Sequence, residues 1–194
     1  MSSFLPVLAL SAALRLLAGP APLAAAPPTP PAPAVLSGHL AHAPAGDSVR
    51  LSYGRVKVKA PLGPAGDFRL AVPGLQAGTP AEFFYASQRT AVYLSPGDQV
   101  RLTLDFPRFD ETLRYTGRGA DVNNYLAQSL WKFEYGPPGA VPRPEFAPTT
   151  TPAQMRRMAD AFRAERKTFL AAYTKTHPLP ADFRRNAALD MDLQ

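Results

Sequence analysis

Two glycines one residue apart, Gly117 and Gly119, stand between a strand-like run and a helix-like run in YTGRGADVNNYLAQ (115–128). Glycines at the start of a helix can let backbone N–H groups approach a phosphate, as in dinucleotide-binding domains. That fingerprint also needs a third glycine, a parallel βαβ unit and an acidic residue about 20 positions further on. The third glycine is missing, and no Lys-Ser or Lys-Thr pair directly follows the glycines to complete a phosphate loop. We therefore expect the pair to turn the chain from strand into helix, and we expect no cofactor.

Ser48 lies in GDSV, a setting that invites comparison with a serine esterase. A nucleophile elbow would place a glycine two residues after the serine, and an acid and a histidine would have to activate it. Neither that glycine nor an Asp-x-x-His set near the C-terminus is present. The stretch is better explained as a turn that opens a strand, and esterase activity at Ser48 is kept only as a third hypothesis.

Three histidines, His39, His42 and His177, are the candidates for metal ligation by imidazole. HLAH places the first two three residues apart, and in a strand that spacing sends the side chains to opposite faces. The chain has no cysteine, which excludes a disulfide, a thiolate metal site, a cysteine nucleophile and a Cys-x-x-Cys redox pair within these residues. We expect no catalytic residue and no metal ligand, and hence no enzyme.

The formal net charge of +6 is spread over predicted strands and helices. The densest basic cluster, RRMADAFRAERK (156–167), also contains Asp160 and Glu165. Mixed charge of this kind favours a solvated helix face over a nucleic-acid surface. No nucleic-acid partner is expected.

The first 26 residues are typical of an export signal, because an apolar run is followed by small residues that end in three alanines at 24–26. A membrane-spanning helix needs about 20 apolar residues, and Arg15 and Pro20 interrupt this run. The Pro-rich tract at 27–34 indicates an extended linker. We expect a periplasmic or secreted protein of the cell envelope, with no stable membrane span once residues 1–26 are removed.

Residues 35–118 predict a domain made mainly of strands. Short runs of alternating apolar and polar residues, such as SVRLSYG, RVKVKAPL and DQVRLTLDF, are separated by Gly, Pro and Asp, and ETLRYT (111–116) closes the set. In RVKVKAPL, the alternation places Arg55, Lys57 and Lys59 on one face. The pattern predicts a mainly β fold, an antiparallel β-sandwich of about seven to eight strands.

Four aromatic residues fall in the apolar runs AEFFYAS and TAVYLS, which suit central strands: Phe83, Phe84, Tyr85 and Tyr93. Packing in the core is their expected role. In a binding module they would be the first residues to inspect as a ligand surface.

From residue 119 the apolar period becomes helical, so 119–194 predicts a helical extension. A first helix is expected to reach Phe133, and a Pro-rich loop is expected at 136–152. Thr151 and Gln154 form a capping box that should open a second helix, with Pro152 at its first position.

The second helix carries an apolar stripe that core packing explains better than a cofactor site: Met155, Met158, Ala159, Phe162, Phe169, Leu170 and Tyr173. A third helix, expected from about Pro180, contains Phe183, Ala187 and Leu189 and reaches Gln194 without a cap, which suggests a truncated chain. Isolated helices of this length are marginal in water. We therefore expect the extension to be less stable than the strands and to self-associate or bind a protein partner.

The stretch at 92–128 resembles the N-terminal region of the TlpA-like thiol-disulfide oxidoreductases found in the envelope of Bacteroidetes-type bacteria. Three motifs carry the resemblance, a Leu-x-Pro-Gly-Asp turn, a Phe-Asp strand and a Tyr-x-Gly-x-Gly-Ala-x-x-Asn-x-Tyr-Leu junction. Here they are Leu94, Pro96, Gly97 and Asp98, then Phe109 and Asp110, then Tyr115, Gly117, Gly119, Ala120, Asn123 or Asn124, Tyr125 and Leu126.

The resemblance implies an export signal, a β-rich domain, a helical connector and then a thioredoxin-fold domain with Trp-Cys-x-x-Cys. The fourth part is absent from these residues, and Trp131 has no cysteine near it, so no catalytic residue carries over. The implied function is a non-catalytic accessory domain that positions or dimerises a redox domain missing from this chain. The alternative is a stand-alone secreted β-sandwich that binds an envelope polymer or a partner protein.

Overall fold

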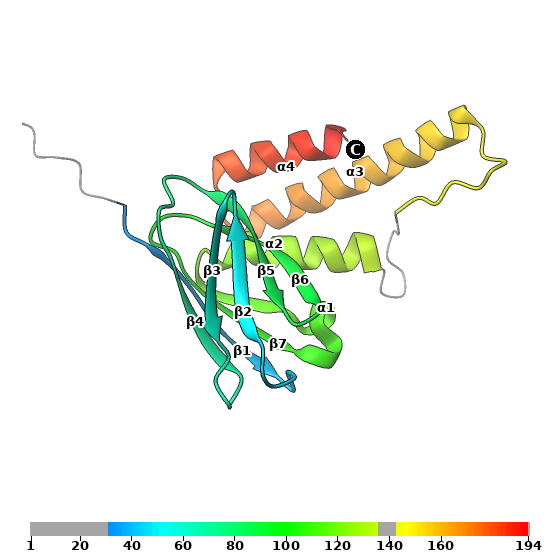
Figure 1. Ribbon diagram of the computed structural model, residues 1–194. Coiled ribbons are helices and arrows are strands. Elements are labelled where there is room, and N and C mark those ends of the chain that lie inside the picture. The colour runs from blue at the N-terminus through cyan, green and yellow to red at the C-terminus, as the bar shows by residue number, and fades with distance from the viewer. Residues whose placement is uncertain (1–30, 136–142, 194) are drawn as a thin grey trace, which may run out of the picture. The chain divides into compact units, whose positions relative to one another are not determined.

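The computed structural model describes residues 31–135 and 143–193, drawn in colour in Figure 1. The signal expected at 1–26, the first half of the linker expected at 27–34 and the first part of the loop expected at 136–152 lie outside the described residues. Strand β1 (Ala34–Ala41) already includes Ala34, the last residue of the expected linker.

Within the described residues, eight strands form two four-stranded sheets, which confirms the predicted number, and the pairing is antiparallel as predicted except at one pair of strands. The first sheet has the order β4 (Asp67–Val72), β1, β7 (Gln99–Asp105) and β8 (Arg114–Arg118). The second has the order β3 (Val56–Pro61), β2 (Ser48–Tyr53), β5 (Thr79–Tyr85) and β6 (Gln88–Leu94). All of these neighbours are antiparallel except β1 and β7, which run parallel.

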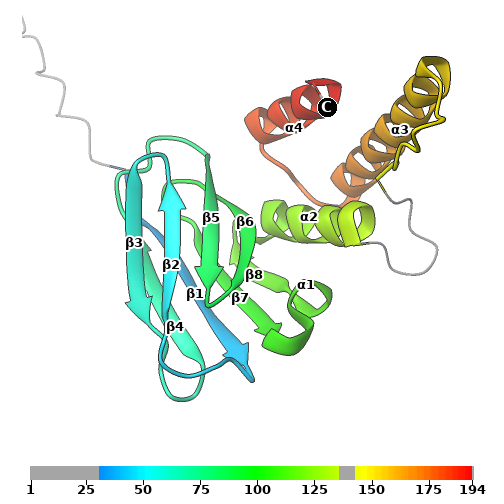
Figure 2. The ribbon, with the colours of Figure 1, turned by 45° about the vertical axis from the view of Figure 1, so that its right-hand side comes forward.

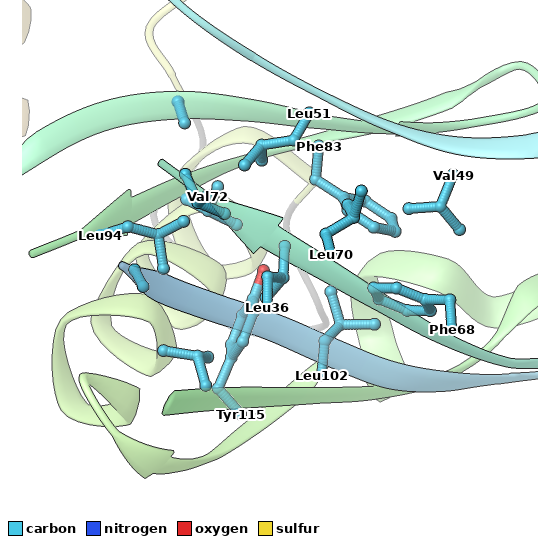
Figure 3. Packing of buried hydrophobic residues seen from close by; sticks show 14 of the residues in the cluster. Leu36, Val49, Leu51, Phe68, Leu70, Val72, Phe83, Leu94, Leu102 and Tyr115 are labelled. Atoms are coloured by element: carbon cyan, nitrogen blue, oxygen red, sulfur yellow. The ribbon is translucent and has the colours of Figure 1, made fainter. Parts of the chain in front are cut away.

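One hydrophobic cluster contains the inward side chains of both sheets (Figure 3). Leu36 and Leu102 come from the first sheet, Leu51 and Phe83 come from the second, and all four are fully buried. The ring of Phe68 on β4 lies 5.5 Å from the ring of Phe83 on β5. Burial of a large apolar side chain contributes about 1.5–3 kcal/mol, so this shared cluster is what holds the two sheets together.

A short helix replaces the start of the strand expected at 111–116. The 3-10 turn η1 (Phe106–Arg108) and helix α1 (Phe109–Thr112) follow β7, and β8 begins only at Arg114. Pro107 cannot donate to a strand ladder and suits the first turn of a helix, and Phe109 is buried in the core. The expectation of a strand at Phe109 and Asp110 is therefore wrong.

Helices make up the rest of the described chain: α2 (Ala120–Leu130), the π-helical turn η2 (Trp131–Tyr135), α3 (Pro152–Thr176) and α4 (Ala181–Leu193). Helices contain at least as many described residues as strands do, so the helix content is higher than the predicted mainly β fold implies. The capping box of α3 is confirmed. The N–H of Thr151 donates to Oε1 of Gln154 at 2.8 Å, and the N–H of Gln154 donates to Oγ1 of Thr151 at 3.3 Å.

Two consecutive asparagines join α2 to the edges of both sheets. Asn123 accepts the N–H of Tyr93 at 2.8 Å and donates to the carbonyl of Tyr93 at 2.9 Å. Asn124 forms the same pair of bonds with Tyr115, at 2.9 and 2.8 Å. Tyr93 lies on β6 and Tyr115 on β8, the edge strands of the second and first sheets. Each side-chain amide thus pairs backbone groups that an edge strand would otherwise leave open, and α2 contacts both edges (Figure 2).

A second hydrophobic cluster joins the three longer helices to β6. Its buried members are Tyr93, Val122, Tyr125, Leu170, Tyr173, Leu179, Phe183 and Met191. The Tyr125 ring is central, 5.5 Å from the ring of Tyr173 on α3 and 5.7 Å from the ring of Phe183 on α4. The helical extension therefore has a core of its own that includes one side chain of the second sheet.

Only part of the expected stripe on α3 is buried. Leu170 and Tyr173 are buried, Met158 is 39% exposed, and the remaining members, Met155, Ala159, Phe162 and Phe169, are half-buried. Leu189 of α4, also expected on a buried face, is 55% exposed. From Phe162 onward α3 packs on α2, η2 and α4, whereas the earlier part of α3 extends beyond them (Figure 1). The prediction of a continuously packed stripe is wrong for that earlier part.

Candidate functional site

The glycine pair lies where β8 leads into α2. Gly117 and Gly119 have φ values of 90° and 92°, a left-handed conformation that favours glycine. A Cβ atom at position 117 would collide with the backbone carbonyl of Gln99. Both residues therefore serve a strand-to-helix turn, as the sequence predicts.

Ser48 begins β2, where its backbone N–H donates to Oδ1 of Asp47 at 2.7 Å. The hydrogen bonds of the three histidines within the described residues go to other groups. The geometry of the structure thus gives Ser48 the place of a residue that opens a strand.

The two neighbouring histidines face different carboxylates. Nδ1 of His39 lies 3.3 Å from Asp67, and Nδ1 of His42 lies 2.8 Å from Asp105. His42 lies after β1 with a φ of 54°, so the alternation assumed for a strand does not apply to it. Across the residues that the structure describes, no three His, Cys, Asp or Glu side chains gather where they could hold a metal ion. His177 stacks on Tyr173 with ring centroids 4.1 Å apart.

The four aromatic residues of the central strands divide between inside and outside. Phe83, Tyr85 and Tyr93 are buried, and the hydroxyl of Tyr85 donates to the carbonyl of Pro44. Phe84 is half-buried and points to the outer face of the second sheet. Of these four, Phe84 is therefore the one available to a ligand on that face.

A row of cations crosses the outer face of the second sheet beside Phe84. The strand register places Lys59 of β3 opposite Arg50 of β2, Arg50 opposite Phe84 of β5, and Phe84 opposite Arg89 of β6. Side chains at paired positions of antiparallel strands lie on the same face. The row therefore runs across all four strands, and its three cations are exposed.

A second row lies two residues further along the strands. Lys57 of β3 pairs with Ser52 of β2, Ser52 with Glu82 of β5, and Glu82 with Ala91 of β6. Together the two rows bring four cations and one carboxylate to this face. We call the residues of both rows the cationic face.

The cationic face encloses a hollow of about 550 Å³. Its walls come from β2, β3 and β5, and they include Arg50, Lys57, Lys59, Glu82 and Phe84. The guanidinium carbon of Arg50 lies 5.9 Å from the centroid of the Phe84 ring, within the range of a cation–π contact.

The four cations of this face form no ion pair with an acidic side chain of the described residues. In the described residues, the ion pairs of Lys and Arg involve other positions, and none includes Arg50, Lys57, Lys59 or Arg89. Like charges directly opposite each other on neighbouring strands destabilise a sheet. The face is therefore suited to an anion, which would relieve this repulsion.

A neighbouring hollow of about 360 Å³ shares Glu82 and Arg89 with the cationic face and adds Phe133 and Tyr135 to its lining. Two further hollows lie elsewhere. One of about 350 Å³ lies between β6, α2 and α4 and is lined chiefly by apolar side chains, among them Tyr93, Phe183 and Met191. Another, of about 420 Å³, is lined by His39, His42 and the glycine-containing turn at 62–66. Neither combines unpaired charge with an aromatic surface as the cationic face does.

Sequence reasoning found only part of this face. The alternation in RVKVKAPL places Lys57 and Lys59 together, but Arg50 and Arg89 lie on other strands. The sheet order β3-β2-β5-β6 skips β4, so the row cannot be deduced until the strand order and register are known.

None of the helices within the described residues combines the length and hydrophobicity that a bilayer crossing requires. Searches of protein-family models, of curated proteins and of solved structures gave no match to the chain.

Proposed function

We propose that this chain is a non-catalytic accessory domain, which positions or dimerises a redox domain as in the TlpA-like oxidoreductases of the cell envelope. It would consist of a β-sandwich and a helical arm, the name used here for α2, α3 and α4. The resemblance at 92–128 supports the proposal. The observation that carries it is the double docking of α2 by Asn123 and Asn124, which fixes the arm to the edge of each sheet at once.

Docking of this kind suits a spacer that must hold its orientation. Asn123 is fully buried and also donates to the carbonyl of Gly119 at 2.8 Å, at the start of α2. The hydroxyl of Tyr173 on α3 donates to the carbonyl of Asp121 at 3.0 Å, and the hydroxyl of Tyr93 donates to Asp182 of α4 at 2.8 Å. Each of the three longer helices is thus fixed to β6 or to α2 by at least one polar contact besides its apolar packing.

The exposed part of the arm is the surface proposed for self-association or for a protein partner. Met158 is exposed on α3, and Met155 and Phe162 on the same stripe are half-buried. Flexible methionine side chains are frequent on surfaces that bind other proteins.

Sedimentation at increasing concentration, with the full chain, tests this role. We expect a reversible dimer that Met158→Glu abolishes, and Ala164→Glu, which changes charge on another exposed face of α3, should leave it intact. Hydrogen exchange on the dilute protein should show amides of Met155 to Phe162 less protected than those of Val100 to Leu104 in β7. A strict monomer in which the α3 amides are protected as well as those of β7 would contradict the proposal.

The cationic face favours a second function, that of a binding module for an envelope polymer. An accessory domain has no need of unpaired like charges on a sheet, whereas a module for an anionic ligand does.

A further inference from the structure

The outer face of the first sheet provides a comparison for the cationic face. There, Asp67 lies 3.6 Å from Arg101 and 3.3 Å from His39, so one carboxylate stands between two of the basic side chains of that sheet. On the second sheet, Arg50 stands directly opposite Lys59, and the carboxylate of that face, Glu82, lies in the next row, opposite Ser52. Like charges opposed on neighbouring strands cost stability, and an anion bound between them would remove that cost.

The spacing of the charges fits an extended chain. Neighbouring strands lie about 4.8 Å apart, so the row from Lys59 to Arg89 spans roughly 14 Å across three strand intervals. Lys57 and Lys59 stand roughly 7 Å apart along β3. An anionic group repeated along a linear polymer can therefore contact one cation after another.

The other groups of the face indicate what lies between those anions. Phe84 presents one ring beside the hollow, and Ser52 and Glu82 stand in the second row. A hydroxyl-rich ligand can donate hydrogen bonds to the carboxylate of Glu82, and the ring can pack on the apolar face of a sugar.

Nucleic acid fits these groups less well. Single-stranded nucleic acid is usually bound by successive aromatic side chains on which bases stack, and this face has one aromatic ring. The carboxylate of Glu82 repels any polyanion, and the hydroxyls of a sugar can offset this by donating hydrogen bonds to it, whereas a phosphate backbone offers few donors.

We propose that the cationic face binds a linear acidic polysaccharide of the uronate class. Arg50, Lys57, Lys59 and Arg89 contact its carboxylates, Phe84 packs on a sugar ring, and Glu82 accepts hydrogen bonds from its hydroxyls. The proposal names the ligand class of the binding module suggested above and is independent of the helical arm.

Calorimetric titration of the full chain with hexagalacturonate tests the proposal, with cellohexaose, inorganic polyphosphate and oligothymidylate as the other ligands. We expect hexagalacturonate to bind best and its affinity to fall as salt rises. Lys59→Glu and Arg50→Glu should each reduce the affinity at least tenfold. Arg157→Glu, the same charge reversal at an exposed position of α3, should change it less than twofold.

Two further variants separate the ligand classes. Phe84→Ala should weaken hexagalacturonate and leave polyphosphate unchanged, and Glu82→Gln should weaken hexagalacturonate while it strengthens polyphosphate. Lys59→Glu should also raise the midpoint of thermal unfolding, because it places opposite charges across β2 and β3. A loss of binding in this variant could therefore not be attributed to unfolding.

Three outcomes would overturn the proposal. They are no binding of hexagalacturonate at low salt, tighter binding of oligothymidylate or polyphosphate, and an equal loss of affinity in Arg157→Glu and Lys59→Glu. None of these outcomes bears on dimerisation through Met158. The accessory role is tested separately, by the sedimentation experiment.

Discussion

Oδ2 of Asp98 lies against Gly119 so closely that a Cβ atom at position 119 would stand 2.6 Å from it. Asp98 belongs to the turn between β6 and β7, where Oδ2 accepts the N–H of Ser95 at 2.7 Å. Burial raises the pKa of the Asp98 carboxyl, despite the hydrogen bond from Ser95 and the nearby Arg118. The turn before β7 and the strand-to-helix junction at Gly119 thus meet at one contact.

Replacement of Gly119 by alanine should therefore destabilise the protein. The left-handed backbone and the displacement of Asp98 together predict a loss of about 2–4 kcal/mol in the free energy of unfolding. Gly54→Ala is the matched control, because Gly54 also has positive φ but has no atom within 4 Å of the added Cβ. It should lose about 1–2 kcal/mol in urea unfolding. Equal losses in the two variants would show that the contact with Asp98 contributes nothing.

Asn123→Ala should loosen the helical arm from the second sheet. The change leaves the N–H and carbonyl of Tyr93 without their partner in a buried place, and each such group costs about 1–3 kcal/mol. Hydrogen exchange should show the Tyr93 amide losing its protection. Gln128→Ala, at an exposed position of the same helix, should have little effect on either measurement. An unchanged Tyr93 amide in Asn123→Ala would contradict the docking role.

Two tyrosine-to-phenylalanine variants should behave differently. The hydroxyl of Tyr93 donates to Oδ2 of Asp182, and its loss should cost about 1–2 kcal/mol. The hydroxyl of Tyr115 is buried near Thr90 but forms no hydrogen bond of good geometry with the described residues, so Tyr115→Phe should cost less stability than Tyr93→Phe. Thermal unfolding of both variants beside the parent protein measures this contrast, and a larger loss in Tyr115→Phe would show that its hydroxyl has a partner.

Acid should weaken the contact between β6 and α4. The hydrogen bond from Tyr93, followed by that from the N–H of Phe183, lowers the pKa of Asp182. A carboxyl with a lowered pKa in the folded protein stabilises it above the unfolded pKa of about 4, and that stability is lost as pH falls through the folded pKa. The stability difference between the parent protein and Asp182→Asn should therefore be present at pH 7 and shrink below about pH 4. A difference that stays constant from neutral to acidic pH would argue against a stabilising role for the ionised carboxylate.

High pH should also weaken the attachment of the helices, through the ionisation of two tyrosines. Burial, supported by the hydrogen bond to Asp182, raises the pKa of Tyr93 to about 12, and burial raises that of Tyr173 to about 12 as well. A raised pKa contributes stability that is complete below the unfolded value of about 10 and is lost as pH rises through the folded value. Circular dichroism should show that the parent protein begins to lose helix above about pH 10. In the Tyr93→Phe, Tyr173→Phe double variant, helix content should change less between pH 7 and this alkaline range. An equal change in both proteins would contradict the prediction.

The strands and helix starts could be predicted because their signals are local. Alternation such as Phe68, Leu70 and Val72 gives one buried face in any antiparallel sheet, and the capping box at Thr151 acts within four residues. The short helix at Phe109 escaped prediction because a buried phenylalanine and one proline outweighed a strand-like pattern. The exposure of Met158 also escaped, since the length of α3 exceeds that of the helices available to cover it.

The candidate site depends on information that is not local. Each of Arg50, Lys59 and Arg89 is an ordinary polar position on its own strand. The pairings β3 with β2, β2 with β5 and β5 with β6 together place them in one row. The sequence shows Asn123 and Asn124 side by side after the glycine pair. Their hydrogen bonds to two different sheets could not be deduced from adjacent positions in the chain.

The parallel pairing of β1 with β7 has a consequence for how the chain folds. Ser37 of β1 donates to the carbonyl of Val100 of β7, a residue 63 positions away, whereas β2 with β3 and β5 with β6 pair with near neighbours. Contacts between residues distant in sequence form slowly, because the loop between them must first be closed. The hairpins of the second sheet are therefore able to assemble while the first sheet still lacks its central pair. Until β7 has been synthesised and has met β1, the first strand of the domain has no parallel neighbour, and the nascent chain must remain partly open along that edge.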